Sequence, residues 1–402
     1  MRIFISGFTG KRLLVPVFLL FLSGIVFALD DKDIKITEPH FTGSNSSIVD
    51  MMNSKAKEKF DEYRDSIISE LGFLPKNFTN LAKGFANASV FSSDGASQRG
   101  YEGYNAFTFT FGFIGALQLP HYSILKDIMN TINSGGEGNK GSDFIKDIAN
   151  VPFGYDLQAL NAQFGINTSK ILLEGLYIGF KFSKFDTNWI KTIPISGFSF
   201  STMSIGVNAS YQFIRQKRLF AGLLVWRGLN FGTGFIWQNT SLDIALALPL
   251  GEGLSDVKVP ISDNISISMP INEVFNLDFK TNTYIVPFEA MTSIRFAWFL
   301  NLALGAGIDV AFGGSKINAS GSLTGDKDKV TITGTVPQDD IRMDVAPSLK
   351  FSLAGNSSPS IFNVKAMFAA GFNLGPVIID IPVTYYFLSN GWSLGLTFGV
   401  TL

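Results

Sequence analysis

The chain has 402 residues, a formal net charge of −1, two histidines and no cysteine. The lack of cysteine excludes disulfides, thiolate metal sites and lipid attachment through a thiol, and the balanced charge gives no support to a nucleic-acid partner. Charged residues make up only 16% of the chain, against about 25% in ordinary soluble domains. After the N-terminus no apolar run approaches the roughly 18 residues of a spanning helix, so we expect any membrane contact to be made by strands.

The N-terminus is typical of a secretory signal peptide. Arg2, Lys11 and Arg12 precede an apolar run over 13–27, and Ala28 follows at the position that a signal peptidase reads. The pattern predicts a signal peptide over 1–28, with an uncleaved membrane anchor as the alternative.

Residues 29–105 form a polar segment with two predicted helices. A helix is expected over 48–71 with Ser47 as its N-cap, because apolar residues recur there at spacings of three and four. A shorter helix is expected over 79–85, and the charge run over 55–65 is interpreted as a solvated face. We expect this segment either to fold back into a lumen as a plug or to form a periplasmic cap.

Strand alternation begins at Phe107, where phenylalanine occupies every second position to Phe113, and it stops at Pro120. The periodicity over 121–170 is helical, including residues 157–164, and predicts a helical insertion after the first strand. Residues 136–141 match G-x-G-x-x-G, but no strand precedes them, so a flexible linker is predicted.

The rest of the chain reads as strand after strand. The clearest pair is 377–387 and 392–402, where bulky apolar residues alternate with small or polar ones. Counting the candidates predicts about 14 antiparallel strands, within a range of 12–16, in an all-β transmembrane barrel over 106–402. The short links 215–217 and 373–376 indicate periplasmic turns, and 251–256 and 313–329 indicate outer loops.

The phase of the charges supports this reading, because ionised groups fall opposite the apolar positions in most strands, although the phase is ambiguous at Lys181 and Arg227. An arginine or lysine facing lipid near the midplane costs about 2–4 kcal/mol. A soluble sheet with one wet face would show the same phasing, but it would not need so many aromatic residues or so few charges. Acidic and basic side chains together in the lumen either form ion pairs that fill the interior or select the solutes that pass. The residues predicted to line the lumen are Glu289, Arg295, Asp309, Arg342, Asp344, Lys350, Lys365 and Asp380.

Catalytic and metal-binding patterns are not found. His40 and His121 lie outside the predicted strands, so neither can serve as the base of a serine hydrolase in a barrel wall. Residues 326–329 lack the glycine and the terminal glutamate of a calcium loop. We expect a protein that is not an enzyme and has no cofactor and no metal.

By its signal peptide, its terminal strand pair and its charge phasing, the chain resembles bacterial outer-membrane β-barrels over about 107–402. A long N-terminal segment before about 14 strands is similar to the FadL-type family of fatty-acid channels, although the Asn-Pro-Ala plug motif of that family is not found here. The resemblance implies passive uptake of small hydrophobic molecules, gated by the N-terminal plug.

The alternatives are a general diffusion porin and a surface adhesin or structural barrel. The expected partners are the outer-membrane bilayer of a Gram-negative-type bacterium, the barrel assembly machinery and a hydrophobic small molecule.

Overall fold

The structure is a computed structural model. It describes residues 34–71, 78–93, 107–119, 152–168, 173–187, 197–246, 256–262, 265–334 and 341–402. The predicted signal peptide, the linker over 136–141 and most of the predicted helical insertion lie outside these ranges.

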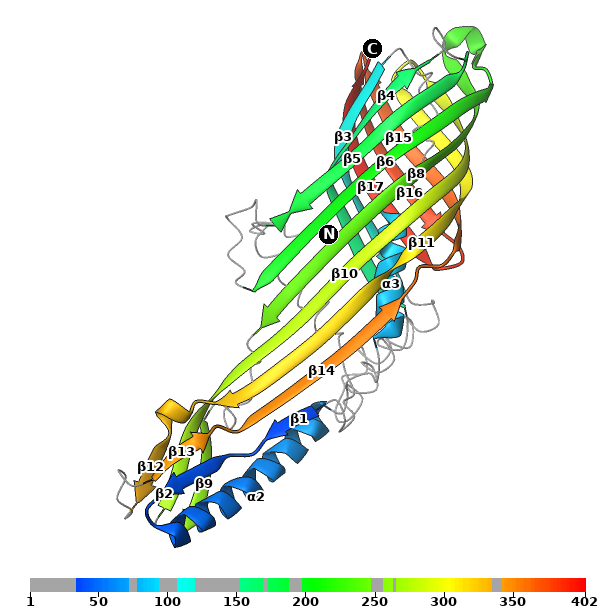
Figure 1. Cartoon of the computed structure of the whole chain (residues 1–402). Coiled ribbons are helices and arrows are strands. Elements are labelled where there is room, and N and C mark those ends of the chain that lie inside the picture. The colour runs from blue at the N-terminus through cyan, green and yellow to red at the C-terminus, as the bar shows by residue number, and fades with distance from the viewer. Residues whose placement is uncertain are drawn as a thin grey trace, which may run out of the picture.

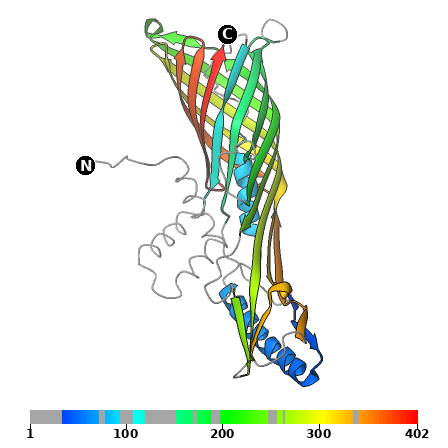
Figure 2. The same ribbon diagram turned by 90° about the vertical axis from the view of Figure 1, so that its left-hand side faces the viewer.

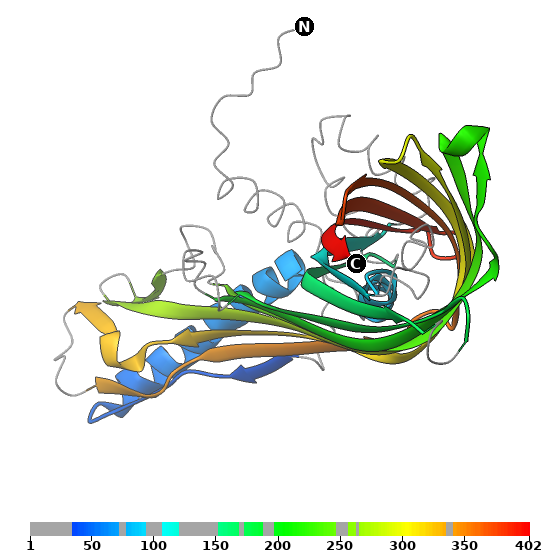
Figure 3. The same cartoon turned by 90° about the horizontal axis from the view of Figure 1, so that it is seen from above.

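Ten antiparallel strands close into a ring within the described residues (Figures 1 and 3). Each strand pairs with the next, and the last pairs with the first along Thr108↔Thr401 to Gln118↔Gly391. In ring order the strands are β3 (Phe107–Gln118), β4 (Gly154–Asn167), β5 (Leu176–Asp186), β6 (Phe198–Ile214), β8 (Leu224–Leu246), β10 (Ile265–Phe296), β11 (Leu300–Gly325), β15 (Phe362–Leu374), β16 (Val377–Tyr386) and β17 (Gly391–Thr401). Closure leaves no unpaired edge in the wall.

Strands β8, β10 and β11 continue beyond one end of the ring and contribute to an elongated extension (Figures 1 and 2). Strand β11 pairs with β15 over Leu300–Val310 and then with β14 (Ser348–Ser357) over Ser315–Thr324, while β10 accompanies it throughout. Strand β1 (Ile34–Thr37) adds to β14. We use "extension" for β1, β14, the tip described next, and the parts of β8, β10 and β11 past the ring.

The tip of the extension consists of short strands and one long helix. Strands β9 (Asp256–Ser262) and β12 (Thr331–Gly334) flank the start of β10, and β13 (Ile341–Val345) pairs with β2 (His40–Gly43). The helix is α2 (Ser46–Leu71), and the turn η4 (Lys327–Lys329) contacts β10 and β13. At the opposite end, β7 (Lys217–Leu219) pairs with β8 and η3 (Phe220–Gly222) follows.

Helix α2 follows its sequence pattern closely. Asn45, not the predicted Ser47, caps it, since the backbone N–H of Ile48 donates to Asn45 Oδ1 at 3.3 Å. Val49, Met52 and Ala56 are buried in a cluster with residues of β2, β10 and β13.

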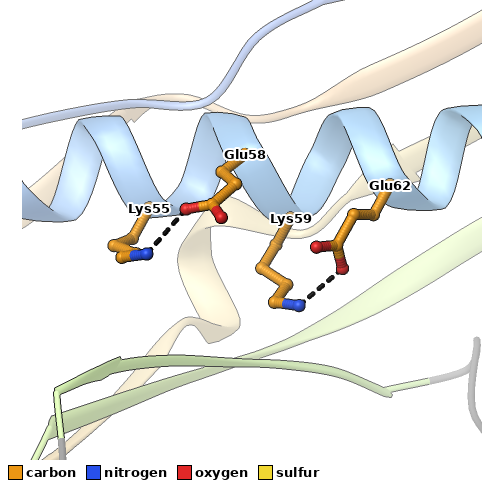
Figure 4. A network of polar contacts seen from close by, with 4 residues as sticks. All are labelled: Lys55, Glu58, Lys59 and Glu62. Atoms are coloured by element: carbon orange, nitrogen blue, oxygen red, sulfur yellow. Dashed lines mark hydrogen bonds and ion pairs between the residues drawn. The ribbon is translucent and has the colours of Figure 1, made fainter.

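The other face of α2 is charged and wet, as predicted (Figure 4). Lys55 Nζ lies 2.7 Å from Glu58 Oε2, and Lys59 pairs with Glu62 one turn later. The hydrogen bond from Lys55 lowers the pKa of Glu58. Exposed pairs of this kind contribute little to stability, so the buried face positions the helix.

The second helix, α3 (Thr79–Phe91), is longer than the predicted 79–85 and lies inside the ring, near the end where the extension begins (Figures 1 and 3). Every residue from Gly84 to Phe91 is buried. The chain therefore runs from the extension into the ring, and β3 then starts at the far end, beside the end of β17.

In the part of the chain that the structure describes, no helix is both long enough and apolar enough to cross a membrane.

The prediction of about 14 strands is not confirmed, because the described ring contains ten. Several candidates belong to one long strand: β8 joins two of them, and β11 runs through Gly313, where the sequence indicated a loop. Others, such as 343–353, lie in the extension. Alternation identifies a strand, but it does not show where the strand stops or which neighbours it has.

The prediction of helix over 157–164 is wrong, because β4 is a strand there. The cause is a bulge: Leu160 has φ 59° and the β3–β4 register shifts between Gly112 and Ile114. The extra residue places the outward-facing Leu157, Leu160 and Phe164 at spacings of three and four, which imitates a helical period.

Candidate functional site: the interior of the barrel

The two faces of the ring differ sharply in chemistry. Large apolar side chains are exposed on the outside of the ring strands, including Phe111, Phe164, Phe180, Phe235, Phe288, Leu304, Phe368 and Leu394. Charged side chains on the same strands are buried on the inside, and Asp309, Lys365 and Asp380 are at most 1% exposed. An apolar band around a closed wall is the surface that a lipid bilayer requires.

Helix α3 fills the ring at the end nearer the extension, first through apolar contacts. Phe85 packs 4.5 Å from the ring of Phe279 and 5.2 Å from that of Tyr155, measured between centroids. Gly84 touches the backbone of the segment that enters β4, and a Cβ there would lie 2.0 Å from the carbonyl oxygen of Phe153. Only glycine permits this approach.

A layer of buried polar side chains holds the C-terminal end of α3. Ser92 Oγ donates to Asp156 Oδ2 at 2.5 Å, and Thr240 Oγ1 donates to Asp156 Oδ1 at 3.0 Å. Gln238 also donates to Asp156 and accepts from Gln158 at 2.5 Å. The Asp156 carboxylate, 3% exposed, thus has three side-chain donors, as a buried carboxylate requires.

Other contacts tie the same helix to further parts of the wall. The hydroxyls of Ser89 and Thr283 lie 2.8 Å apart, linking α3 to β10. The ring of Phe91 stacks on Tyr386 of β16 at 4.1 Å. Asn87 Oδ1 accepts from the backbone N–H of Ser360 at 2.7 Å. Because these contacts reach strands on several sides, α3 is an integral part of the interior.

Beyond α3 the interior contains a buried ion cluster. Lys365 Nζ lies 2.7 Å from Asp309 Oδ1 and also contacts the Glu289 carboxylate. Glu289, Gly307 and Lys365 share one row across β10, β11 and β15, and Tyr386 continues it on β16. Gly307 has no side chain to separate its two charged neighbours. The three ionised groups are nearly excluded from solvent, so each depends on the others for compensation.

The predicted lumen residues fall into two groups. Glu289, Asp309 and Lys365 meet in the cluster, Asp380 is buried on the inner face of β16, and Arg295 is half-buried on the same face of β10 as Met291.

Arg342, Asp344 and Lys350 do not line the lumen. Arg342 and Asp344 form an exposed ion pair at 3.1 Å on β13, and Lys350 is exposed on β14, both in the extension. Each of these residues lies on the polar face of its strand, as predicted. The alternation of side chains does not show, however, whether that strand belongs to the ring.

Sequence reasoning missed Asp156 and left the phase of Lys181 and Arg227 ambiguous, and all three are buried charged residues of the ring strands. Asp156 lies beside the stretch taken for a helix, and β-bulges obscure the phase near Arg227. A single buried carboxylate with hydrogen-bonding partners far apart in the sequence leaves no local signal.

Among the described residues no group of three or more histidine, cysteine, aspartate or glutamate side chains is placed to bind a metal ion. That the protein is not an enzyme stays a prediction.

A closed ring of antiparallel strands with an apolar outer face and charged side chains inside defines a transmembrane β-barrel of the outer-membrane type. The chain belongs to the Lsa36-like family, whose model matches residues 37–401. No curated protein sequence matches it.

Solved barrels resemble it only distantly. The translocator domain of the autotransporter NalP from Neisseria meningitidis is 9% identical, with 74% of this chain and 88% of that chain covered and a TM-score of 0.25. The toluene transporter TbuX from Ralstonia pickettii is 9% identical, covering 81% and 99%, with a TM-score of 0.23. Ail, the attachment invasion locus protein of Yersinia pestis, is 10% identical, covering 74% and 97%, with a TM-score of 0.20. Likenesses this low decide nothing about function.

Proposed function

We propose that the protein is a closed outer-membrane barrel that anchors the extension and presents it on the outer side of the membrane. The observation that carries this proposal is the occupied interior, in which α3 and the side chains of Glu289, Asp309 and Lys365 are buried. An open diffusion pore would leave such groups in contact with water. The burial therefore favours a closed barrel over the porin alternative.

The cost of displacing α3 supports the same proposal. Withdrawal breaks several buried hydrogen bonds, at about 1 kcal/mol each, and exposes Phe85 and Phe91, at about 2 kcal/mol each. A total on the order of 8 kcal/mol keeps the open form below about one molecule in 10⁵. At rest the barrel is shut.

The lengths of the connections supply the orientation. At the end where β3 begins, β10 turns into β11 through residues 297–299 and β15 turns into β16 through 375–376. At the extension end, residues 119–153 separate β3 from β4 and 326–361 separate β11 from β15, while β16 turns into β17 through 387–390. Outer-membrane barrels have short periplasmic turns and longer outer loops, and this rule supports an orientation with the extension outside. The links 215–217 and 373–376 share the short-turn end.

The absence of cysteine allows a direct test of orientation. Asp328→Cys places a thiol on η4 in the extension, and Lys217→Cys places one on β7 at the short-turn end. A membrane-impermeant maleimide is expected to label residue 328 in intact cells, and residue 217 only after the outer membrane is permeabilised. The reverse pattern would overturn the proposed orientation.

A gated channel for small hydrophobic molecules is the second candidate, and one observation favours it. Phe78, Leu81 and Phe85 of the α3 region pack into an apolar cluster that continues along the inner face of the extension through Leu277 and Phe351. A hydrophobic ligand entering this cluster would compete with the helix for the same surface.

Planar-bilayer recording separates the candidates. If the barrel is a closed anchor, we expect no conductance with or without an added aliphatic ligand. If it is a gated channel, we expect it to conduct only when the ligand is present. Steady conductance of the wild-type protein without ligand would contradict both.

A further inference from the structure

A shallow groove crosses the outer face of the extension, over β1, β14, β11 and β10, away from the barrel interior. Its volume is about 430 Å³, and Val274, Gly321 and Phe351 form the apolar part of its lining. The polar part consists of Lys35, Asn276, Ser320, Ser322, Lys350 and Ser352. Lys35 lies directly opposite Lys350 in the β1–β14 register, and Lys350 lies opposite Ser322. The row thus places two ammonium groups beside a floor of hydroxyl and amide groups.

Two other lysines of the extension have carboxylate partners. Lys57 pairs with Glu38 at 2.7 Å, and Lys329 pairs with Asp326 at 3.0 Å. Within the described residues neither Lys35 nor Lys350 has an ion-pair partner, and both are exposed. Like charges directly opposite on adjacent strands destabilise a sheet. A bound anion would remove this repulsion.

The height of the groove above the membrane decides the source of the anion. Phe312 is the last large apolar residue exposed on the outer face of β11, and Ser322, opposite Lys350, follows ten residues later. Val274 of β10, opposite Ser322, is a single exposed apolar side chain at the level of the groove. At about 3.3 Å per residue and a tilt of about 40°, this is about 25 Å beyond the apolar band. The headgroup layer is only about 5–8 Å thick on each side, so the lipids that surround the barrel do not reach the groove.

We propose that this groove binds an acidic glycan through its sulfate groups. Because Lys35 and Lys350 lie side by side on adjacent strands, both can contact one sulfate group. Each ammonium offers three hydrogen-bond donors and no acceptor, which suits an anion. Ser320, Ser352 and Asn276 supply both donors and acceptors for the sugar hydroxyls around it. Sequence phasing placed Lys350 in the lumen, whereas the structure makes it half of this site.

The test uses the full-length folded protein in detergent micelles, so its outcome does not depend on the orientation of the barrel in cells. Binding of a sulfated heparin octasaccharide is measured by calorimetry at two salt concentrations, beside a desulfated octasaccharide and phosphatidylglycerol vesicles. The sulfated sugar is expected to bind at least tenfold more tightly than the desulfated one, and more weakly at high salt. Equal binding of both sugars, or a preference for the vesicles, would overturn the proposal.

Matched variants then separate a site from general charge. Lys35→Gln with Lys350→Gln is expected to weaken binding of the sulfated sugar at least tenfold. Lys57→Gln with Lys329→Gln removes the same charge from the same extension and is expected to change it less than twofold. Equal losses in the two double variants, or no loss in the first, would refute the site. Unchanged urea midpoints confirm that both variants fold.

Discussion

The buried ion cluster provides a sharp test of the closed interior. Lys365→Met keeps the length of the side chain and removes the charge that lies 2.7 Å from Asp309 and in contact with Glu289. Two carboxylates then remain side by side without a cation. Breaking a buried pair in this way costs about 3–5 kcal/mol, which lowers the equilibrium constant for folding by about two to four orders of magnitude.

The assay is urea unfolding of the barrel refolded in detergent micelles, followed by tryptophan fluorescence and by the mobility difference between folded and unfolded protein on gels. The triple variant Lys365→Met, Glu289→Gln, Asp309→Asn carries no charge in the cluster and is expected to recover most of the loss. Lys280→Met, which removes an exposed pair at 3.6 Å from Asp278, serves as the matched control and is expected to cost little. If Lys365→Met costs no more than Lys280→Met, water reaches the carboxylates and the closed interior is refuted.

Three further substitutions probe the helix, the polar layer and the wall. Asp156→Ala strands three buried donors and is expected to cost about 3 kcal/mol by urea unfolding. Asp326→Ala, which removes the side-chain cap of the η4 turn, should cost only about 1 kcal/mol. Gly84→Val forces a Cβ to within 2.0 Å of a backbone oxygen, so α3 must shift and bilayer recordings should show conductance that the wild type lacks. Leu304→Arg places a charge in the apolar band and should cost about 2–4 kcal/mol, whereas Ala354→Arg, outward-facing on the extension, should fold as well as the wild type. An equal cost at positions 304 and 354 would contradict the membrane assignment.

Local physics made much of the wall predictable from sequence. The strand pair 377–387 and 392–402 agrees with β16 and β17 to within a few residues, because alternation needs no knowledge of neighbours. Asp309, Lys365 and Asp380 are buried opposite the apolar phase for the same reason. A charge in lipid is costly at any position in the ring, so the sequence of each strand by itself shows charged residues only on the face away from lipid.

The sequence did not show which strands pair with one another. Strand β10 spans Ile265–Phe296, and its two halves have the same alternation, although one faces lipid and the other belongs to the extension. The pairing of β11 with β15 and then with β14 decides which residues line the interior, and these partners are distant in the chain. The cluster of Lys365, Glu289 and Asp309 combines three strands, so no local pattern predicts it.

The position of α3 has a consequence for how the molecule is made. The helix precedes β3 in the chain, yet the finished wall surrounds it, with β3 and β17 paired over eleven residue positions. A helix about 10 Å across cannot slip sideways between hydrogen-bonded strands. The N-terminal portion therefore reaches the interior in one of two ways: it is in place before β3 and β17 pair, or it enters along the barrel axis from the end where the extension begins.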